Sequence, residues 1–130
     1  METRIMGIYL ICFGDSEKNL SIALKEKVIG INQAAQFDEK ASAYLIVKRQ
    51  NNWTVVAKAN IKKRVEMNPF PKPNKYRVYE IINVVECNPY SISDLLKSEL
   101  GNMYGLALRT PNLITAQELI IGVENRFTLS

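Results

Sequence analysis

The sequence contains no histidine and only two cysteines, Cys12 and Cys87. Without histidine, the Ser-His and Cys-His pairs of nucleophilic catalysis are excluded, and so is the commonest zinc ligand. No Cys-x-x-Cys motif, phosphate-binding loop, dinucleotide-binding glycine motif or nucleophile elbow is present. We therefore expect a protein that is not an enzyme and that needs no metal or cofactor.

Both cysteines lie in apolar, strand-like runs, which is typical of reduced core residues. A disulfide between Cys12 and Cys87 stays open as an alternative if the two runs are neighbours in the fold.

Long hydrophobic runs are also missing. The apolar stretch IMGIYLICF, residues 5–13, is far shorter than the ~20 residues of a membrane span. It is followed by Gly-Asp-Ser and lacks a small-residue cleavage site, so we interpret it as a strand and not as a signal peptide. With 130 residues, 47% of them hydrophobic, we expect a single domain over residues 1–130, located in the cytoplasm and not on a membrane.

Positive charge is concentrated in one segment. Residues 48–77 contain nine of the 17 lysines and arginines and a single acid, a net charge of +8, whereas the rest of the chain carries −4. A local positive field on an otherwise acidic body indicates a polyanionic partner. The alternative is a hairpin whose lysines only face solvent.

Hydrophobic periodicity and chain-breaking residues predict the elements. Strands are expected at 4–13, 43–48, 53–61, 76–86 and 103–109, and helices at 16–27, 91–100 and about 116–124. The first helix would carry one apolar stripe through Leu20, Leu24, Val28 and Ile31, and Asn88-Pro89 would end the strand 76–86. Strands in the middle with helices early and late predict an α+β fold with a curved antiparallel sheet.

The loop VEMNPFPKPNKYR, residues 65–77, combines cations, aromatic rings and three prolines. Lys72, Lys75 and Arg77 can neutralise phosphates, and Phe70 and Tyr76 can stack on unpaired bases. The prolines stiffen the loop and lower the entropy that it loses on binding. The alternative is a proline-rich connector in which Phe70 closes the edge of the core.

Two further residues could contact a base. Trp53 opens a predicted strand, where packing in the core or at its rim is the alternative role. Asp15 lies at a strand-to-helix junction, where it could accept an exocyclic amine of a base or simply cap the helix.

The chain resembles the YTH and EVE branch of the PUA-like superfamily over about residues 5–125. The helix start Ser16-Glu17-Lys18-Asn19-Leu20 is similar to the Ser-Glu-Asp-Asp-Ile type of YTH domains. The segments AYLIVK and WTVVA resemble the hairpin of that family, and KYRVYEI resembles the strand that follows its basic loop.

The resemblance implies a small, partly open β-barrel flanked by helices, which holds one flipped-out modified base in an aromatic cage beside a basic rim. The sequence departs from YTH domains at the cage, because Ile29 and Phe70 stand where that family has tryptophans. EVE-like relatives, such as the N-terminal specificity modules of McrB-type restriction enzymes, fit better. The base-pocket residues implied are Asp15, Trp53, Phe70 and Tyr76. The phosphate-binding residues implied are Lys58, Lys62, Lys63, Arg64, Lys72, Lys75 and Arg77.

The function implied is recognition of a methylated base flipped out of duplex DNA, in a restriction or defence system and as part of a longer chain or a nuclease complex. Three alternatives stay open. The chain could be an RNA-binding PUA-like domain, a domain that sequesters a nucleotide, or a protein-interaction domain whose basic hairpin meets an acidic partner.

Overall fold

A computed structural model describes residues 8–14, 16–31, 41–70, 77–100, 112–114 and 117–129. These residues form an α+β fold, as predicted. The elements in chain order are β1 (Ile8–Cys12), α1 (Glu17–Glu26), β2 (Val28–Ile31), β3 (Ala41–Arg49), β4 (Asn52–Val65), β5 (Arg77–Ser91), α2 (Ser93–Leu100), β6 (Asn112–Ile114) and α3 (Gln117–Asn125).

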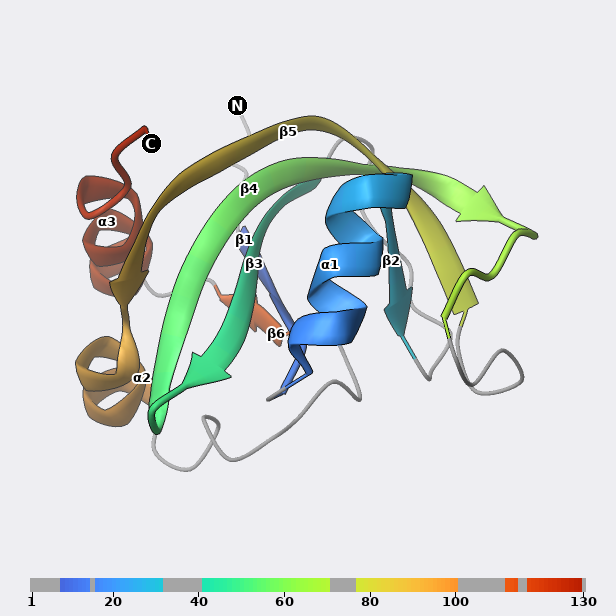
Figure 1. The fold of residues 1–130 in the computed structure, drawn as a ribbon. Coiled ribbons are helices and arrows are strands. Elements are labelled where there is room, and N and C mark those ends of the chain that lie inside the picture. The colour runs from blue at the N-terminus through green and yellow to red at the C-terminus, as the bar shows by residue number, and fades with distance from the viewer. Residues whose placement is uncertain are drawn as a thin grey trace, which may run out of the picture.

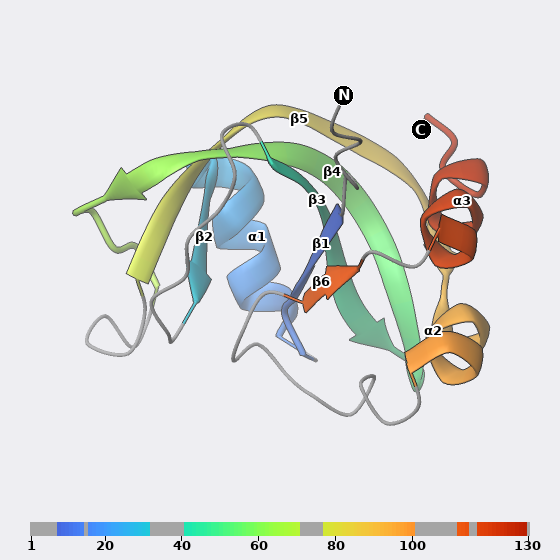
Figure 2. The same cartoon turned by 180° about the vertical axis from the view of Figure 1, so that it is seen from behind.

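The described strands form one curled sheet in the order β2-β5-β4-β3-β1-β6. Figure 1 shows α1 lying within the curve of the sheet, whereas α2 and α3 lie together at one end. The same arrangement is visible from behind in Figure 2. The curved sheet flanked by helices is confirmed, but it is mixed and not purely antiparallel, because β1 and β3 run parallel. The chain crosses over through α1 and β2 between them, and such a crossover is what a parallel pair requires.

Helix α1 begins and ends close to the predicted bounds. The Ser16 hydroxyl accepts a hydrogen bond from the backbone N–H of Asn19 at 3.2 Å, so Ser16 is the N-cap, and Asp15 lies outside the described residues. Lys27 then takes the left-handed conformation, with φ of 59°, and ends the helix. The predicted apolar stripe was wrong beyond this point. Val28 and Ile31 belong to β2, a strand of β-branched residues that pairs with β5.

The β3–β4 hairpin is confirmed and is longer than predicted. Its two-residue loop consists of Gln50 and Asn51, whose φ angles of 50° and 62° match the twist of a tight hairpin. Strand β4 extends to Val65, past the end of β3, whose first residue Ala41 is opposite Ile61.

The prediction that Asn88-Pro89 ends a strand was wrong. Strand β5 runs through Pro89 to Ser91, because the pairing jumps from Ala57↔Glu86 to Val55↔Tyr90. Pro89 therefore lies in a bulge, where the missing N–H breaks no regular ladder bond.

The C-terminal part shows smaller differences. Helix α2 begins at Ser93, two residues later than predicted, and the Ser91 hydroxyl accepts a hydrogen bond from the Ser93 N–H at 3.3 Å. Helix α3 lies within one residue of its predicted bounds. The strand predicted at 103–109 lies outside the described residues, and β6 at 112–114, which pairs with β1, was not predicted.

Buried side chains form one core on each face of the sheet. The inner core lies against α1 and includes Phe13, Leu20, Leu45, Ile61 and Phe70. The outer core lies against α2 and α3 and includes Leu10, Ile46, Trp53, Leu96 and Val123. We call these two sides of the sheet the inner face and the outer face. No helix in the described part of the chain is long and apolar enough to cross a membrane.

Cys12 and Cys87 are both buried in the outer core and are not bonded to each other. The prediction that they are reduced core residues is confirmed. Burial raises the pKa of the Cys12 thiol to about 11, so this side chain stays protonated at neutral pH and behaves as a packing residue.

Candidate nucleic-acid interface

Four of the predicted phosphate-binding cations lie on β4 and are exposed: Lys58, Lys62, Lys63 and Arg64. The last three belong to the part of β4 that extends past β3, which Figure 1 shows projecting at one end of the sheet. We call residues 62–65 the basic end of β4. Among the described strands, only β5 pairs with this part of β4, and the side chains of Lys62, Lys63 and Arg64 are exposed, so a large ligand can reach them.

The cations differ in how strongly the protein already engages them. The Lys62 ammonium lies 3.7 Å from a Glu80 carboxylate oxygen, and Arg77 is half-buried with an interaction of its own. Within the described parts of the chain, Lys63 and Arg64 form no ion pair. These two side chains are therefore the best placed to meet phosphates. Lys72 and Lys75 lie outside the described residues.

The structure places the two described base-pocket residues, Trp53 and Phe70, in the cores on opposite faces of the sheet. The Trp53 side chain is 3% exposed in the outer core, and its backbone N–H donates to the Ser93 hydroxyl at 2.7 Å. Phe70 is 4% exposed in the inner core. Asp15 and Tyr76 lie outside the described residues. Trp53 and Phe70 thus take the packing roles that were their alternatives, and contact of either with a base stays a prediction.

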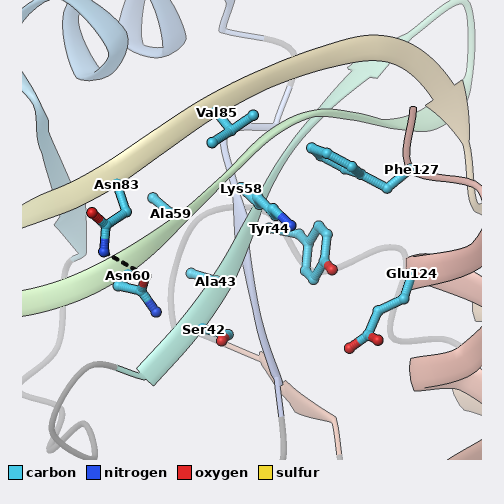
Figure 3. Close-up of a pocket in the computed structure, with 10 residues that line it drawn as sticks. All are labelled: Ser42, Ala43, Tyr44, Lys58, Ala59, Asn60, Asn83, Val85, Glu124 and Phe127. Atoms are coloured by element: carbon cyan, nitrogen blue, oxygen red, sulfur yellow. Dashed lines mark hydrogen bonds between the residues drawn. The ribbon is translucent and has the colours of Figure 1, made fainter. Parts of the chain in front are cut away.

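A pocket that the sequence did not indicate lies on the outer face, with a cavity volume of about 570 Å³ (Figure 3). Its floor consists of residues from three adjacent strands, and its end wall comes from α3 and the residues just after it. The polar and aromatic side chains that line it are Ser42 and Tyr44 from β3, Lys58 and Asn60 from β4, Asn83 from β5, and Glu124 and Phe127. We call it the outer pocket.

Aromatic rings and one cation lie together at the α3 end of the outer pocket. The rings of Tyr44 and Phe127 meet edge to face, with centroids 6.1 Å apart. The Lys58 ammonium lies 4.6 Å from the Phe127 centroid, a cation–π contact that restrains a long side chain. Burial, and secondarily the Glu124 carboxylate, raises the pKa of Tyr44 to about 12, so its phenol keeps its proton at neutral pH.

Two carboxamides lie at the other end of the outer pocket. The Asn83 Nδ2 group donates to Asn60 Oδ1 at 3.1 Å, the dashed line in Figure 3. Asn83 has a φ of 54°, because the pairing jumps there from Lys58↔Val85 to Asn60↔Ile82 and leaves a bulge. Bulges re-aim side chains, and this one turns the Asn83 amide toward β4.

The segment after α3 is held against β5 and α2, which fixes Phe127. The Arg126 guanidinium donates two hydrogen bonds of 2.8 Å to the Asp94 carboxylate and one of 3.0 Å to the Ser91 carbonyl. On the other side of Phe127, the Thr128 carbonyl accepts from the Asn88 N–H at 2.9 Å. Arg126 lowers the pKa of Asp94 to about 2. The wall of the outer pocket is therefore formed before any ligand arrives.

The comparisons with known proteins identify the fold. No family model matches the chain, and no curated protein sequence matches it. Among solved structures, a crystal structure of the Mmi1 YTH domain matches with a TM-score of 0.58 and 14% identity, over 92% of this chain and 95% of that one. A complex of the YTH domain-containing protein mmi1 with RNA matches with a TM-score of 0.62 and 16% identity, over 92% of this chain and 80% of that one.

A crystal structure of the Mmi1 YTH domain in complex with RNA also matches, with a TM-score of 0.57 and 14% identity, over 95% of this chain and 84% of that one. At such low identities these matches establish the fold and not the ligand. The described elements therefore form a YTH-like fold.

Proposed function

We propose that this chain is a nucleic-acid-binding domain whose ligand is RNA, and that it acts by binding and not by catalysis. The exposed cations on β4 carry this proposal, because Lys63 and Arg64 lie on a projecting strand end without an ion pair among the described residues. Phosphates supply most of the affinity of such surfaces. Two of the compared structures of this fold contain RNA, which supports RNA as the ligand class.

Recognition of a methylated base is the narrower form of the proposal. A single base would leave its stack and enter a pocket while the backbone lies along β4. Two of the compared solved structures contain RNA, so they support RNA recognition better than duplex DNA or a restriction role. Those DNA-directed roles therefore rest on the sequence resemblance alone.

The proposal is tested by fluorescence anisotropy at several salt concentrations. The probes are a single-stranded RNA, the same RNA with N6-methyladenosine, a single-stranded DNA, and duplex DNA with and without N6-methyladenine or 5-methylcytosine. We expect the tightest binding to single-stranded RNA, with an affinity that falls steeply with salt. Tighter binding to a methylated duplex than to either RNA would restore the DNA hypothesis, and binding to none of the probes would contradict the proposal.

A charge-reversal pair locates the phosphate-binding surface. Lys63→Glu with Arg64→Glu should weaken RNA binding by about tenfold or more and flatten the log–log salt slope by about 0.7 for each phosphate that the protein no longer neutralises. Lys18→Glu with Lys25→Glu makes the same charge change at exposed positions of α1 and serves as the matched control. Equal losses of affinity in the two double variants would show that only net charge matters and would remove the basic end of β4 from the interface.

A further inference from the structure

We propose that the outer pocket binds one unpaired nucleobase that carries an exocyclic amine. The inference rests on the proposed function, since the base would belong to the RNA strand held by the basic end of β4. Lys58 in the pocket and Lys62 at the basic end lie four residues apart on the same strand, about 13 Å at the usual rise of a β-strand. One short stretch of single-stranded RNA can therefore occupy both places.

The size and polarity of the outer pocket suit a single base and not a phosphate alone. Its volume of about 570 Å³ lies in the range of small-molecule sites. Lys58 and Glu124 contribute one charge of each sign. A carboxylate beside the pocket repels a free phosphate, whereas it leaves a neutral heterocycle unaffected. The charges thus favour an uncharged ring over an anion.

The polar groups match the edge of a base with an amino group. Glutamate accepts a hydrogen bond from an exocyclic amine, and asparagine can pair with the donor and acceptor edge of adenine. Glu124 lies at the α3 end of the outer pocket and the Asn60–Asn83 pair at the other, so an inserted ring can meet both (Figure 3). Uracil has two carbonyls and no exocyclic amine, so it should bind more weakly than adenine, cytosine or guanine.

The aromatic end supplies a surface that is already ordered. Tyr44 is held edge to face against Phe127, and Lys58 rests on the ring of Phe127. Arg126 is tied to Asp94 and the Thr128 carbonyl to Asn88, one residue on either side of Phe127. Because these side chains lose little freedom when a ligand arrives, contacts to a base cost less ordering entropy here than on a mobile surface.

Titration with AMP, CMP, GMP and UMP, each followed by ¹H–¹⁵N NMR, tests the pocket without RNA. We expect the side-chain amide signals of Asn60 and Asn83 and the backbone signal of Phe127 to shift. UMP should bind at least about fivefold more weakly than the others, since a base contact of this kind is worth ~1–3 kcal/mol. Equal affinity for the four nucleotides would overturn the amine preference, and no shift at these three residues would overturn the site.

Two variants alter the outer pocket in different ways, one by filling it and one by removing a charge. Ser42 is exposed on β3, so Ser42→Trp should fill the outer pocket without disturbing a core, and Ser21→Trp on the exposed side of α1 is the matched control. Lys58→Met keeps the aliphatic stem and removes the charge. A dispersed NMR spectrum checks the fold of each variant. Both pocket variants should abolish or weaken the nucleotide shifts, and Ser21→Trp should not.

RNA binding by the same variants separates this inference from the proposed function. Ser42→Trp should weaken RNA binding about five- to tenfold and leave the salt slope unchanged, since a stacked base contributes ~1–3 kcal/mol and every phosphate stays neutralised. Unchanged RNA affinity in Ser42→Trp would overturn the base site and leave the RNA proposal standing. Nucleotide shifts in a protein that binds no RNA would support the pocket and overturn the RNA proposal.

Discussion

The basic end of β4 and the outer pocket lie on the same strand but present different surfaces to a ligand. At residues 62–65 the strand has passed the end of β3, and Lys63 and Arg64 are exposed there and form no ion pair among the described residues. Around Lys58 and Asn60 the strand lies in the middle of the sheet, where neighbouring side chains already hold the polar groups in place. Exposed cations attract RNA phosphates whatever the RNA sequence is, whereas amides and rings held in fixed positions can distinguish one base from another.

Affinity and selectivity would therefore come from different parts of one strand. Phosphate contacts respond to salt and tolerate a change of position, because a lysine can follow a moving anion. Contacts to a base require fixed geometry, and the bulge at Asn83 and the Arg126–Asp94 ion pair are features that supply it. Substitutions at Phe70, Asn83 and Asp94 test whether affinity and selectivity come from these different parts of β4.

The largest effect is expected at Phe70, which lies just beyond the basic end of β4. Its side chain is 4% exposed in the inner core, so Phe70→Ala should lower the free energy of unfolding by ~3–5 kcal/mol. Urea denaturation measures this, and Lys63→Ala is the control, expected within ~0.5 kcal/mol of the parent protein. A destabilisation below ~1 kcal/mol would mean that Phe70 is free to leave the core and could stack on a base, as the sequence suggests.

Four elements of the fold show how much of it the sequence alone could predict. Local signals were sufficient for the bounds of α1 and for the β3–β4 hairpin, but not for the cap of α1, which is Ser16 and not Asp15. They failed at Val28–Ile31, which continue the helical spacing of α1 but are extended after Lys27 adopts the left-handed conformation. They failed again at Pro89, because the bulge that tolerates it depends on the register against β4.

The site was harder to predict than the fold. Lys58 and Asn60 alternate with the buried Ala57 and Ala59, so this part of β4 carries polar side chains on the outer face. Nothing in the order of residues, however, indicates that Phe127 returns from the end of the chain to lie beside Lys58. The outer pocket depends on long-range contacts, whereas the charge of the basic end of β4 is visible in a single segment.

The next largest effect is expected at Asn83, where backbone strain and a pocket contact can be separated. Asn83→Ala should cost ~1–2 kcal/mol of stability, because alanine lacks the side chain that makes a φ of 54° acceptable and that bonds to Asn60. Asn83→Gly should cost less, since glycine adopts this conformation freely. Both variants should lose nucleotide binding alike, as followed by NMR. Retained binding in Asn83→Gly would show that the bulge matters and the amide does not.

The smallest effect is expected at the ion pair that holds the wall of the outer pocket. Arg126 lowers the pKa of Asp94 from its usual value near 3.8 to about 2, so the pair stabilises the fold above about pH 4 and loses this contribution as the pH falls toward 2. Because the Asp94 side chain is 64% exposed, solvent screening limits its value to below ~1 kcal/mol. Asp94→Asn should therefore be slightly less stable than the parent at pH 7, and this difference should shrink as the pH approaches 2, as measured by urea denaturation at both pH values.

Glu17 provides the control for that measurement. It forms a similar exposed ion pair with Arg49 at 2.7 Å, and this hydrogen bond likewise lowers the pKa of Glu17. Glu17→Gln should therefore show the same kind of small destabilisation at pH 7, but it does not line the outer pocket and should leave nucleotide binding unchanged. If Asp94→Asn also leaves nucleotide binding unchanged at pH 7, then Phe127 is held by its own packing and by the Asn88–Thr128 bond. The wall of the outer pocket would then be ordered without a surface ion pair. Charge would contribute to RNA affinity at the basic end of β4 and not to the shape of the outer pocket.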